Sequence, residues 1–477
     1  MGLMPFFLRR ASERLLCLLS KFMVACYTHC FIPKNVLSGD MNPTVKDTKG
    51  NAASSSNYRP VMQSSCILKL FELHLEEVLS EKLHFSSRQF GYVAQTSTTD
   101  ACLILKETVN KYISKGGKAF ALFVDLSKAF DNVNHFMLGQ LLIDRDVPPD
   151  LVMFLMHYLR NQEARIVWNG VKGKYHCIDK GVRQGGILSP LLFKLYVDNV
   201  LREITAMEVG CKLGILRVNI LAYADDFVIL ADTKEHLDVL YEILERKLRL
   251  LHLIINKNKS KCIVFKKGIR SGENLEMDIG GDSFEVVSQI KYLGHVLQNN
   301  LHDADDIAFR LNSFYAKLHW ILRNFKNTSL EVLLFLFNAY CSPNYGLPLW
   351  CLESVTKTQI FKTFEVAYSN AFKKMLGTPV CTSSHAVADA CNVLLFSHYC
   401  VYIQMRFFKR ILRSKNVLLR TLLFHIKEGY IYQALTKRFI EKYDCHFLEH
   451  TMDILKLRVY WVQRHEPSSG RELVRVF

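Results

Sequence analysis

Apolar and polar positions follow one another along this chain in ways that predict both helices and strands. Apolar residues recur at helical spacing from 67 to 83 and from 101 to 113, with Glu72 among the charged residues opposite, which predicts two amphipathic helices. Unbroken apolar runs at 119–124, 220–222 and 227–231 are typical of strands that are buried on both faces of a sheet. Because strands, hairpins and helices mix without a repeating order, the pattern favours an α+β fold over a doubly wound one.

The segments outside this central pattern give simpler predictions. Residues 15–32 resemble a signal peptide or membrane anchor, but Lys21 and His29 interrupt the run, which is shorter than the ~20 apolar residues that a span requires. An amphipathic core helix is predicted instead, and nothing directs the chain away from the nucleus and cytoplasm. Residues 33–57 are rich in Pro, Gly, Asn and Ser and end in a predicted flexible loop. Beyond residue 300 helices are predicted almost throughout, with aromatic and basic residues interleaved.

The amino-acid composition indicates which class of partner the chain binds. The 477 residues include 61 basic and 45 acidic side chains, and the formal net charge of +16 favours a polyanionic partner such as nucleic acid. The 14 cysteines are irregularly spaced and several lie inside apolar runs, which indicates buried reduced thiols rather than a disulfide framework.

Three acidic residues stand at the ends of the apolar runs. Asp225 and Asp226 lie at the tip of the hairpin that joins the second and third runs, and Asp125 ends the first. Adjacent carboxylates on a buried hairpin repel each other and lose hydration unless a multivalent cation neutralises them. An Asp-Asp turn facing water is the alternative, but such a turn rarely joins two strands that are apolar on both faces. The three carboxylates therefore predict an all-oxygen Mg²⁺ site of the kind that two-metal phosphoryl transfer uses.

Seven short blocks follow one another in a fixed order along the chain. They are 57–60 (NYRP), 89–92 (QFGY), 123–131 (FVDLSKAFD), 181–190 (GVRQGGILSP), 223–226 (YADD), 256–260 (NKNKS) and 291–294 (KYLG). Each block alone is a weak indicator, but together and in this order they resemble the reverse transcriptases of non-LTR (LINE-type) retrotransposons. The resemblance is closest to the branch related to chicken repeat 1 and jockey elements, and it extends over roughly residues 20 to 400.

The resemblance implies a right-hand polymerase of the α+β class, with fingers, a palm built on an antiparallel sheet and a helical thumb. The implied segments are an N-terminal helical segment (1–32), fingers (33–118), a palm (119–300) with an interleaved fingers segment at about 132–180, a helical thumb (301–400) and a helical C-terminal extension (401–477). The implied activity is that of an RNA-directed DNA polymerase, a nucleotidyltransferase that adds deoxynucleotides to a DNA 3′-hydroxyl on an RNA template. The implied partners are template RNA, primer DNA and dNTPs, without a membrane, and an endonuclease activity is expected from another domain or protein.

The resemblance also implies which residues carry the chemistry. Asp125, Asp225 and Asp226 would be the catalytic acids and, with the backbone carbonyl of Leu126, would hold two Mg²⁺ ions, for which Mn²⁺ can substitute. Phe130 would lie beneath the sugar of the incoming nucleotide, where a bulky ring rejects a 2′-hydroxyl. A core phenylalanine is the alternative for that position.

Further positions match the nucleotide and primer sites of the family. The implied nucleotide-binding residues are Arg59, Gln184, Gly185, Lys259 and, in a looser alignment, Lys46. Arginine suits a triphosphate because its planar guanidinium makes bidentate contacts, and glycine lets the backbone approach a ligand closely. Lys259 is also a candidate general acid for the leaving group, with a solvated surface charge as the alternative. Tyr292, Leu293 and Gly294 match the hairpin that grips the primer end.

Two other functions are compatible with these motifs. A group II intron or retron-type reverse transcriptase would share the metal-binding acids and differ in its partner RNA. A catalytically silent RNA-binding protein would keep the fold without the reaction.

Overall fold

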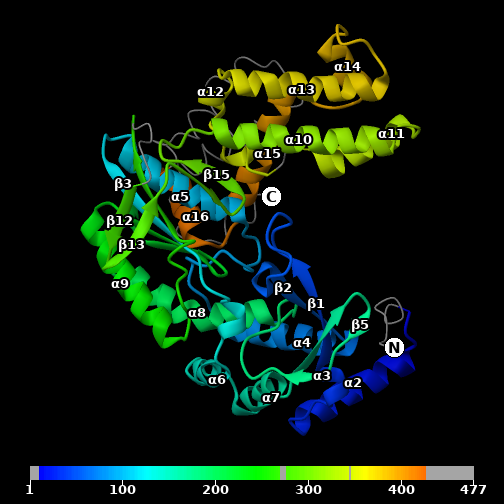
Figure 1. Cartoon of the computed structure of the whole chain (residues 1–477), viewed down its shortest axis with the longest axis vertical. Helices are drawn as coiled ribbons and strands as arrows, with labels where there is room; N and C mark the ends of the chain where they lie inside the picture. Colours follow the sequence, from blue (N-terminus) through cyan, green and yellow to red (C-terminus); the bar gives the residue numbers. More distant parts are fainter. Residues whose placement is uncertain (1–9, 269–274, 343–344, 426–477) are drawn as a thin grey trace.

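The computed structural model describes residues 10–268, 275–342 and 345–425. It arranges the chain as three groups of elements (Figure 1). A large sheet with its covering helices connects a group of N-terminal helices and a small sheet, drawn mainly in blue and cyan, to a group of long helices drawn in yellow-green to orange. The helices expected beyond residue 300 make up this last group.

The largest sheet has six strands in the order β12-β13-β11-β3-β10-β9. Its strands are β3 (Lys118–Val124), β9 (Ile220–Tyr223), β10 (Asp226–Ala231), β11 (Lys261–Lys266), β12 (Leu275–Ile279) and β13 (Asp282–Val286). All neighbouring strands are antiparallel except β11 and β13. The three apolar runs thus form adjacent strands in the middle and at one side of this sheet, as the sequence pattern predicts.

Helices cover both faces of the six-stranded sheet. On one face, α8 (Ser189–Ala206) and α9 (Lys234–Leu250) share a core with Phe227 of β10. On the other face, α5 (Thr98–Ile113) shares a second core with the next residue, Val228. Because successive side chains of a strand point to opposite faces, the stretches of β3, β9 and β10 that are covered on both sides have no position for polar residues.

A second, smaller sheet has the strand order β2-β1-β4-β5, with β6 paired to β4. Its strands are β1 (Ser38–Val45), β2 (Tyr58–Ser64), β4 (Glu163–Trp168), β5 (Val171–Lys172) and β6 (His176–Cys177). Within the segment rich in Pro, Gly, Asn and Ser, residues 38–45 pair with β2 despite a proline, and the predicted loop at 52–57 lies between these two strands. Pro43 stands opposite Pro60, so both missing N–H groups fall at one position of the ladder.

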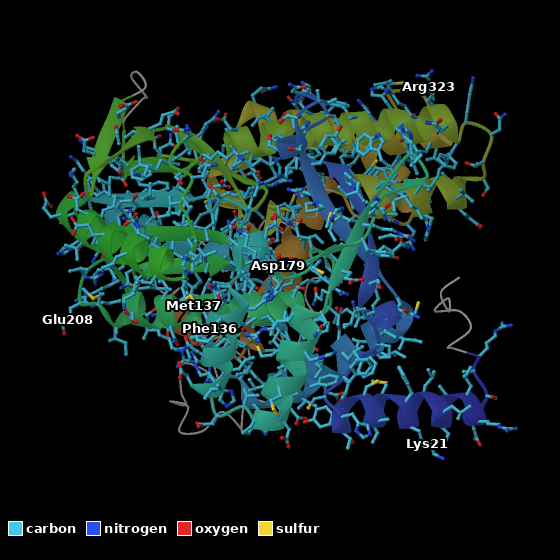
Figure 2. The ribbon with its side chains drawn as sticks, turned by 60° about the horizontal axis from the view of Figure 1, so that its bottom comes forward. Lys21, Phe136, Met137, Asp179, Glu208 and Arg323 are labelled. Atoms are coloured by element: carbon cyan, nitrogen blue, oxygen red, sulfur yellow. The ribbon has the colours of Figure 1, made fainter. Side chains whose placement is uncertain are left out.

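The helices beside the small sheet are α2 (Glu13–Thr28), α3 (Lys34–Leu37), α4 (Cys66–Lys82), α6 (His135–Ile143) and α7 (Pro149–Arg160). The prediction of a core helix near the N-terminus is wrong in one respect, because only Cys26 of the 16 residues in α2 is buried. Figure 2 shows α2 at the edge of the molecule, with Lys21 directed away from it. Apolar spacing therefore predicted the helix correctly but not its burial.

The remaining elements lie between the strands of the two sheets or follow them in the chain. They are the hairpins β7 (Cys211–Leu213) with β8 (Leu216–Val218) and β14 (Gln289–Tyr292) with β15 (His295–Gln298), the helices α10 (Ala304–Asn324), α11 (Leu330–Leu336), α12 (Leu352–Val355), α13 (Gln359–Leu376), α14 (Ser384–Ala390), α15 (Phe396–Leu412) and α16 (Val417–His425), and the short helices η1 (Ser55–Asn57), η2 (Phe130–Asn132), η3 (Phe337–Cys341) and η4 (Leu347–Leu349). The predicted C-terminal extension lies outside the described residues beyond position 425.

The aromatic residues of the helical group divide between core and surface. Phe314 and Phe337 are buried and contact each other edge to face, whereas Trp320 and Phe335 are exposed. The sequence alone could not separate these two sets. Among the described residues, no helix is long and apolar enough to cross a membrane. The predicted α+β class is confirmed by the mixture of sheets and helices.

Candidate functional site

The three acidic residues meet at one end of the six-stranded sheet. Phe227 of β10 pairs with Val124 of β3 in an antiparallel register, so the next positions, Asp226 and Asp125, stand side by side across these two strands. Asp225 is in the two-residue turn that joins β9 to β10. Two stretches of chain that are 100 residues apart thereby bring their carboxylates to the same place.

The electrostatics of this end of the sheet reflect the crowding of negative charge. Burial, followed by the charges of Asp225 and Asp125, raises the pKa of Asp226 to about 6. Burial and the charge of Asp125 also raise the pKa of Asp225, while the positive charge of Arg59 opposes that shift. The Asp226 side chain still has an exposed surface, so solvent screens part of the repulsion. A divalent cation is the natural partner for such a group of carboxylates.

The carboxylates are neighbours but do not form a closed set of ligands. Across residues 10–268, 275–342 and 345–425, no group of three or more His, Cys, Asp or Glu side chains is already arranged to hold a metal ion. The donor chemistry of Asp125, Asp225 and Asp226 nevertheless fits a hard divalent ion, which prefers oxygen ligands.

The turn that carries Asp225 is held by a glutamine side chain. Ala224 has a positive φ of 56°, which is rare for a residue with a Cβ atom. The Oε1 atom of Gln89 accepts hydrogen bonds from the backbone N–H groups of Ala224, at 2.9 Å, and Gly91, at 2.8 Å. The sequence block 89–92 marked this segment only by resemblance, and its role in holding the turn was not predicted.

Gly91 packs against the same turn, and this contact gives a testable prediction. A Cβ atom on Gly91 would lie 2.3 Å from the backbone nitrogen of Ala224, a contact that requires the backbone to move. We expect Gly91→Ala to lower the free energy of unfolding by about 1–3 kcal/mol, the usual range for overpacking. Gly173→Ala is the control, since its Cβ would meet nothing closer than 3.4 Å. Equal thermal unfolding midpoints for the two variants would contradict the prediction.

The backbone of Asp125 is anchored by the block 256–260. The hydroxyl oxygen of Ser260 accepts a hydrogen bond from the Asp125 N–H group at 3.1 Å, and the Asn256 N–H group donates to the Asp125 carbonyl oxygen at 2.8 Å. Leu126 forms an isolated bridge with Ile255. The exposed Lys259 belongs to this turn, in which Asn256 bonds the backbone of Asp125.

Phe130 lies in η2, five residues after Asp125. Its ring is half-buried and stacks on Phe193 of α8, with centroids 4.6 Å apart and planes inclined by 13°. The backbone carbonyl oxygen of Phe130 accepts a hydrogen bond from the N–H group of Val182. One face of the ring is thus fixed by packing, and the residue is tied to the start of the block 181–190.

Gln184 and Gly185 connect this block to strand β2. The Gln184 side-chain amide donates to the Asp131 carboxylate at 2.9 Å, and the Met62 N–H group donates to the Gln184 carbonyl oxygen at 2.8 Å. Gly185 has a φ of 101°, and a Cβ atom there would lie 3.2 Å from the Met62 carbonyl oxygen. The exposed Arg59 lies on the same strand, so β2 brings together three of the predicted nucleotide-binding residues.

A buried glutamate, Glu72, contacts the block 181–190, although the sequence predicted that this residue is exposed. Glu72 was expected on the polar side of its helix, yet it is fully buried in α4. Its carboxylate accepts hydrogen bonds from the Tyr158 hydroxyl at 2.6 Å and from the Ile187 N–H group at 2.8 Å. Helical periodicity could not reveal this role, because the partners come from α7 and from a loop more than 80 residues away.

The remaining predicted residues lie in two hairpins. Lys46 is exposed in the loop between β1 and β2, and its ammonium group donates to the Ser56 carbonyl oxygen at 2.9 Å. This contact holds Lys46 within its own loop. Leu293 and Gly294 form the tight turn between β14 and β15, with φ angles of 45° and 80°.

Tyr292 places the β14–β15 hairpin beside the acids. Its buried ring contacts Phe123 of β3 edge to face, with the centroids 5.1 Å apart. Burial raises the pKa of Tyr292, and the charge of Asp226 adds to this effect. The hairpin that the motifs linked to the primer end therefore packs next to the strand that carries Asp125.

Comparison with known proteins decides the family. Residues 45–297, more than half of the chain, match the family model described as reverse transcriptase (RNA-dependent DNA polymerase). The chain belongs to the reverse transcriptase family. Its right-hand α+β fold is that of the family, and reverse transcriptases generally use divalent metal ions.

Similar curated proteins are named for mobile elements. A Retrovirus-related Pol polyprotein from type-1 retrotransposable element R2 of Nasonia vitripennis is 27% identical over 284 residues, covering 59% of this reverse transcriptase and 27% of that protein. The probable RNA-directed DNA polymerase from transposon X-element of Drosophila melanogaster is 26% identical over 318 residues, covering 62% and 33%. The RNA-directed DNA polymerase from mobile element jockey of Drosophila funebris is 24% identical over 339 residues, covering 68% and 36%.

These relatives confirm the resemblance to non-LTR reverse transcriptases, with jockey among them. The chain spans only between about a quarter and a third of the length of these relatives. Among solved structures, apo telomerase from Candida tropicalis has a TM-score of 0.43 at 15% identity, covering 90% of this chain and 73% of that one.

Proposed function

We propose that this chain is an RNA-directed DNA polymerase of a non-LTR retrotransposon, which adds deoxynucleotides to a DNA 3′-hydroxyl on an RNA template. The observation that carries the proposal is the meeting of Asp125, Asp225 and Asp226 at one end of the sheet, inside the region that matches the family model. The relatives named for R2, X-element and jockey favour this reading over a group II intron or retron enzyme.

Asp125, Asp225 and Asp226, with the backbone carbonyl of Leu126, are the groups that would hold two Mg²⁺ ions, or Mn²⁺ in their place. The raised pKa values of Asp225 and Asp226 support this role, because burial and the neighbouring carboxylates make the charged forms costly, and a bound cation would offset that cost. Bound there, the ions would lower the pKa of the primer hydroxyl and neutralise the triphosphate and the leaving pyrophosphate. The hydrogen bonds that the Ala224 N–H group donates to Gln89 and the Asp125 N–H group donates to Ser260 would keep the acids in place for that task.

The residues around the acids would select and orient the nucleotide. Arg59 is positively charged and near enough to Asp225 to influence its pKa, which suits a side chain that binds the triphosphate. The stacked ring of Phe130 would form the wall that excludes a 2′-hydroxyl. Gln184 and Gly185 would contact the nucleotide and template, Lys259 would lie near the pyrophosphate, and Lys46 is the weakest member of the set because its own loop engages it.

The predicted segments give the surroundings of this reaction. We assign the small sheet with helices α3, α4, α6 and α7 to the fingers, the six-stranded sheet to the palm and helices α10 to α14 to the thumb, within the boundaries given above. Helix α2 belongs to the N-terminal segment, and α15 runs from the thumb into the C-terminal extension. Tyr292, Leu293 and Gly294 would grip the primer end. The enzyme would work in the nucleus and cytoplasm on an RNA template, a DNA primer and dNTPs, with an endonuclease activity supplied by another domain or protein.

Primer extension tests the proposal directly. Purified protein with Mg²⁺ is expected to extend a DNA primer on a homopolymer RNA, and Asp225→Ala is expected to reduce the rate by about 10³-fold, since metal-assisted charge stabilisation is worth several kcal/mol. Asp179→Asn, at an exposed position labelled in Figure 2, is the control for loss of an acid elsewhere. RNA binding without extension would favour a catalytically silent RNA-binding protein. Extension that survives Asp225→Ala would defeat the metal assignment.

A further inference from the structure

The turn of the β14–β15 hairpin is bound by side chains from the helical group that follows it. The guanidinium of Arg310, on α10, donates a hydrogen bond to the Gly294 carbonyl oxygen. The hydroxyl of Tyr345 donates to the Leu293 carbonyl oxygen. Both carbonyl groups of the turn are therefore held by residues that lie beyond the hairpin in the sequence.

Asp306 fixes the position of Arg310 and of the hairpin at the same time. Its fully buried carboxylate lies 3.2 Å from the Arg310 guanidinium and accepts a hydrogen bond from the Val296 N–H group, in β15, at 3.0 Å. The indole N–H group of Trp350 donates to its other oxygen at 2.8 Å. Burial alone would raise the pKa of Asp306, but His295, Arg310 and Trp350 outweigh burial and hold it well below its usual value.

Helix α10 is joined rigidly to the palm side of the molecule as well. Lys106, from the buried helix α5, forms an ion pair with Asp303 at 2.5 Å, and both side chains are almost fully buried. Asp303 also accepts a hydrogen bond from the Cys351 N–H group at 2.9 Å. Breaking a buried pair of this kind leaves an uncompensated charge, so the start of α10 cannot move independently of α5 at low cost.

The packing around the turn leaves little free space. A Cβ atom on Gly294 would lie 2.9 Å from the ring of Tyr345, and a Cβ atom on Gly346 would lie 2.7 Å from the Asp306 carboxylate. The Arg310 guanidinium also lies over the rings of Phe309 and Tyr345, at 5.2 and 4.8 Å from their centroids. The turn and the first half of α10 thus form one closely packed unit.

We propose that Arg310 and Asp306 are positioning residues for the primer end: they set the place of the Leu293–Gly294 turn relative to the acids on β3 and β10. The inference rests on the proposed polymerase function. Through Tyr292 and Phe123 the hairpin packs on the strand that carries Asp125, so a shift of α10 would shift the primer terminus relative to that carboxylate. A displacement of about 1 Å is enough to slow a reaction by about 10²-fold.

Single-turnover primer extension separates this role from simple support of the fold. At saturating primed RNA and dNTP, Arg310→Ala is expected to extend the primer roughly 10- to 100-fold more slowly, with a Kd for primed RNA close to that of the wild type. Arg310→Lys is expected to recover part of the rate, because it keeps a charged donor beside Asp306. Arg323→Ala is the control: this exposed arginine, labelled in Figure 2, lies on the same helix, and its loss is expected to leave the rate unchanged.

A gentler variant keeps the test decisive if Arg310→Ala fails to fold. Tyr345→Phe removes only the hydroxyl that binds the Leu293 carbonyl and keeps the ring on which Arg310 packs, so we expect a smaller loss in the same rate. Unchanged rates for Arg310→Ala or Tyr345→Phe in an active enzyme would overturn the inference, as would a loss that arises entirely from weaker binding of primed RNA. An inactive wild-type protein would instead overturn the proposed function.

Discussion

Asp226→Asn is expected to make this protein more stable while greatly slowing primer extension. In the wild type, burial and the charges of Asp225 and Asp125 raise the pKa of Asp226 to about 6. Removing one negative charge from this group relieves the repulsion at neutral pH. Because the partly desolvated Asp226 side chain still has an exposed surface, where solvent screens the interaction, we expect a gain on the order of 1 kcal/mol in the free energy of unfolding. The extension rate should fall by about 10³-fold, because a metal ligand is lost.

The same cluster of carboxylates predicts how the free energy of unfolding depends on pH. A carboxyl group whose pKa is higher in the folded than in the unfolded protein stabilises the fold when it is protonated. For Asp226 this contribution is complete below the unfolded pKa of about 4 and disappears as the pH rises through about 6. Without divalent ions, Asp226→Asn should therefore raise the thermal unfolding midpoint at pH 7.5 more than at pH 4.

Addition of Mg²⁺ provides the matched measurement. Wild-type protein is expected to unfold at a higher temperature with Mg²⁺ at pH 7.5 and to respond much less at pH 4, where protons already neutralise the carboxylates. The response should be smaller in Asp226→Asn and unchanged in Asp179→Asn. A Mg²⁺ response that is the same in all three proteins would show that the ion acts elsewhere.

Phe130→Val is expected to admit ribonucleotides. The wild-type ring is held in place by its stacking on Phe193, so it presents a fixed wall that a smaller valine cannot replace. Filling or opening a pocket by one or a few carbon atoms changes discrimination by roughly 10- to 200-fold. We expect a change of that size in the ratio of kcat/KM for dNTP to kcat/KM for the matching rNTP, with kcat/KM for dNTP reduced much less.

Phe120→Val is the control for this substitution. Phe120 is also half-buried and lies on β3, but near the opposite end of the strand from Asp125. The Phe120→Val protein should have a lower free energy of unfolding and an unchanged preference for deoxynucleotides. If Phe130→Val folds and keeps the wild-type preference, Phe130 is a core residue and the selection of the sugar must come from another side chain.

The positions of the acids could be predicted from the sequence because they depend on local pattern. A short apolar run with no polar position is typical of a strand covered on both faces, and a charged residue at its end then lies where the strand leaves the core, at the end of the sheet. Asp125 and Asp226 follow from this rule, and the β3–β10 register then brings them together. The Leu293–Gly294 turn is local in the same sense, because glycine accepts the positive φ that a tight turn needs.

The contacts that hold these residues in place could not be predicted in the same way. Gln89, Glu72 and Asp306 act on partners that are distant in the sequence, such as Ala224, Tyr158 and Trp350. The residues next to a buried glutamate in the sequence do not distinguish it from a glutamate on the exposed face of a helix. The burial of Glu72 and the exposure of α2 were therefore both mispredicted from periodicity alone.

By itself the sequence determined the class of fold, the order of the motifs and the three acids of the candidate active site, because each depends on the spacing of apolar and charged residues within a short stretch. Only the tertiary structure decided which polar residues are buried and which groups they contact. One example is the hydrogen bond from Arg310 to the Gly294 carbonyl oxygen. The physical reason is that burying a polar group is tolerated only where a hydrogen-bond partner is supplied, and that partner comes from whichever distant segment the fold brings near.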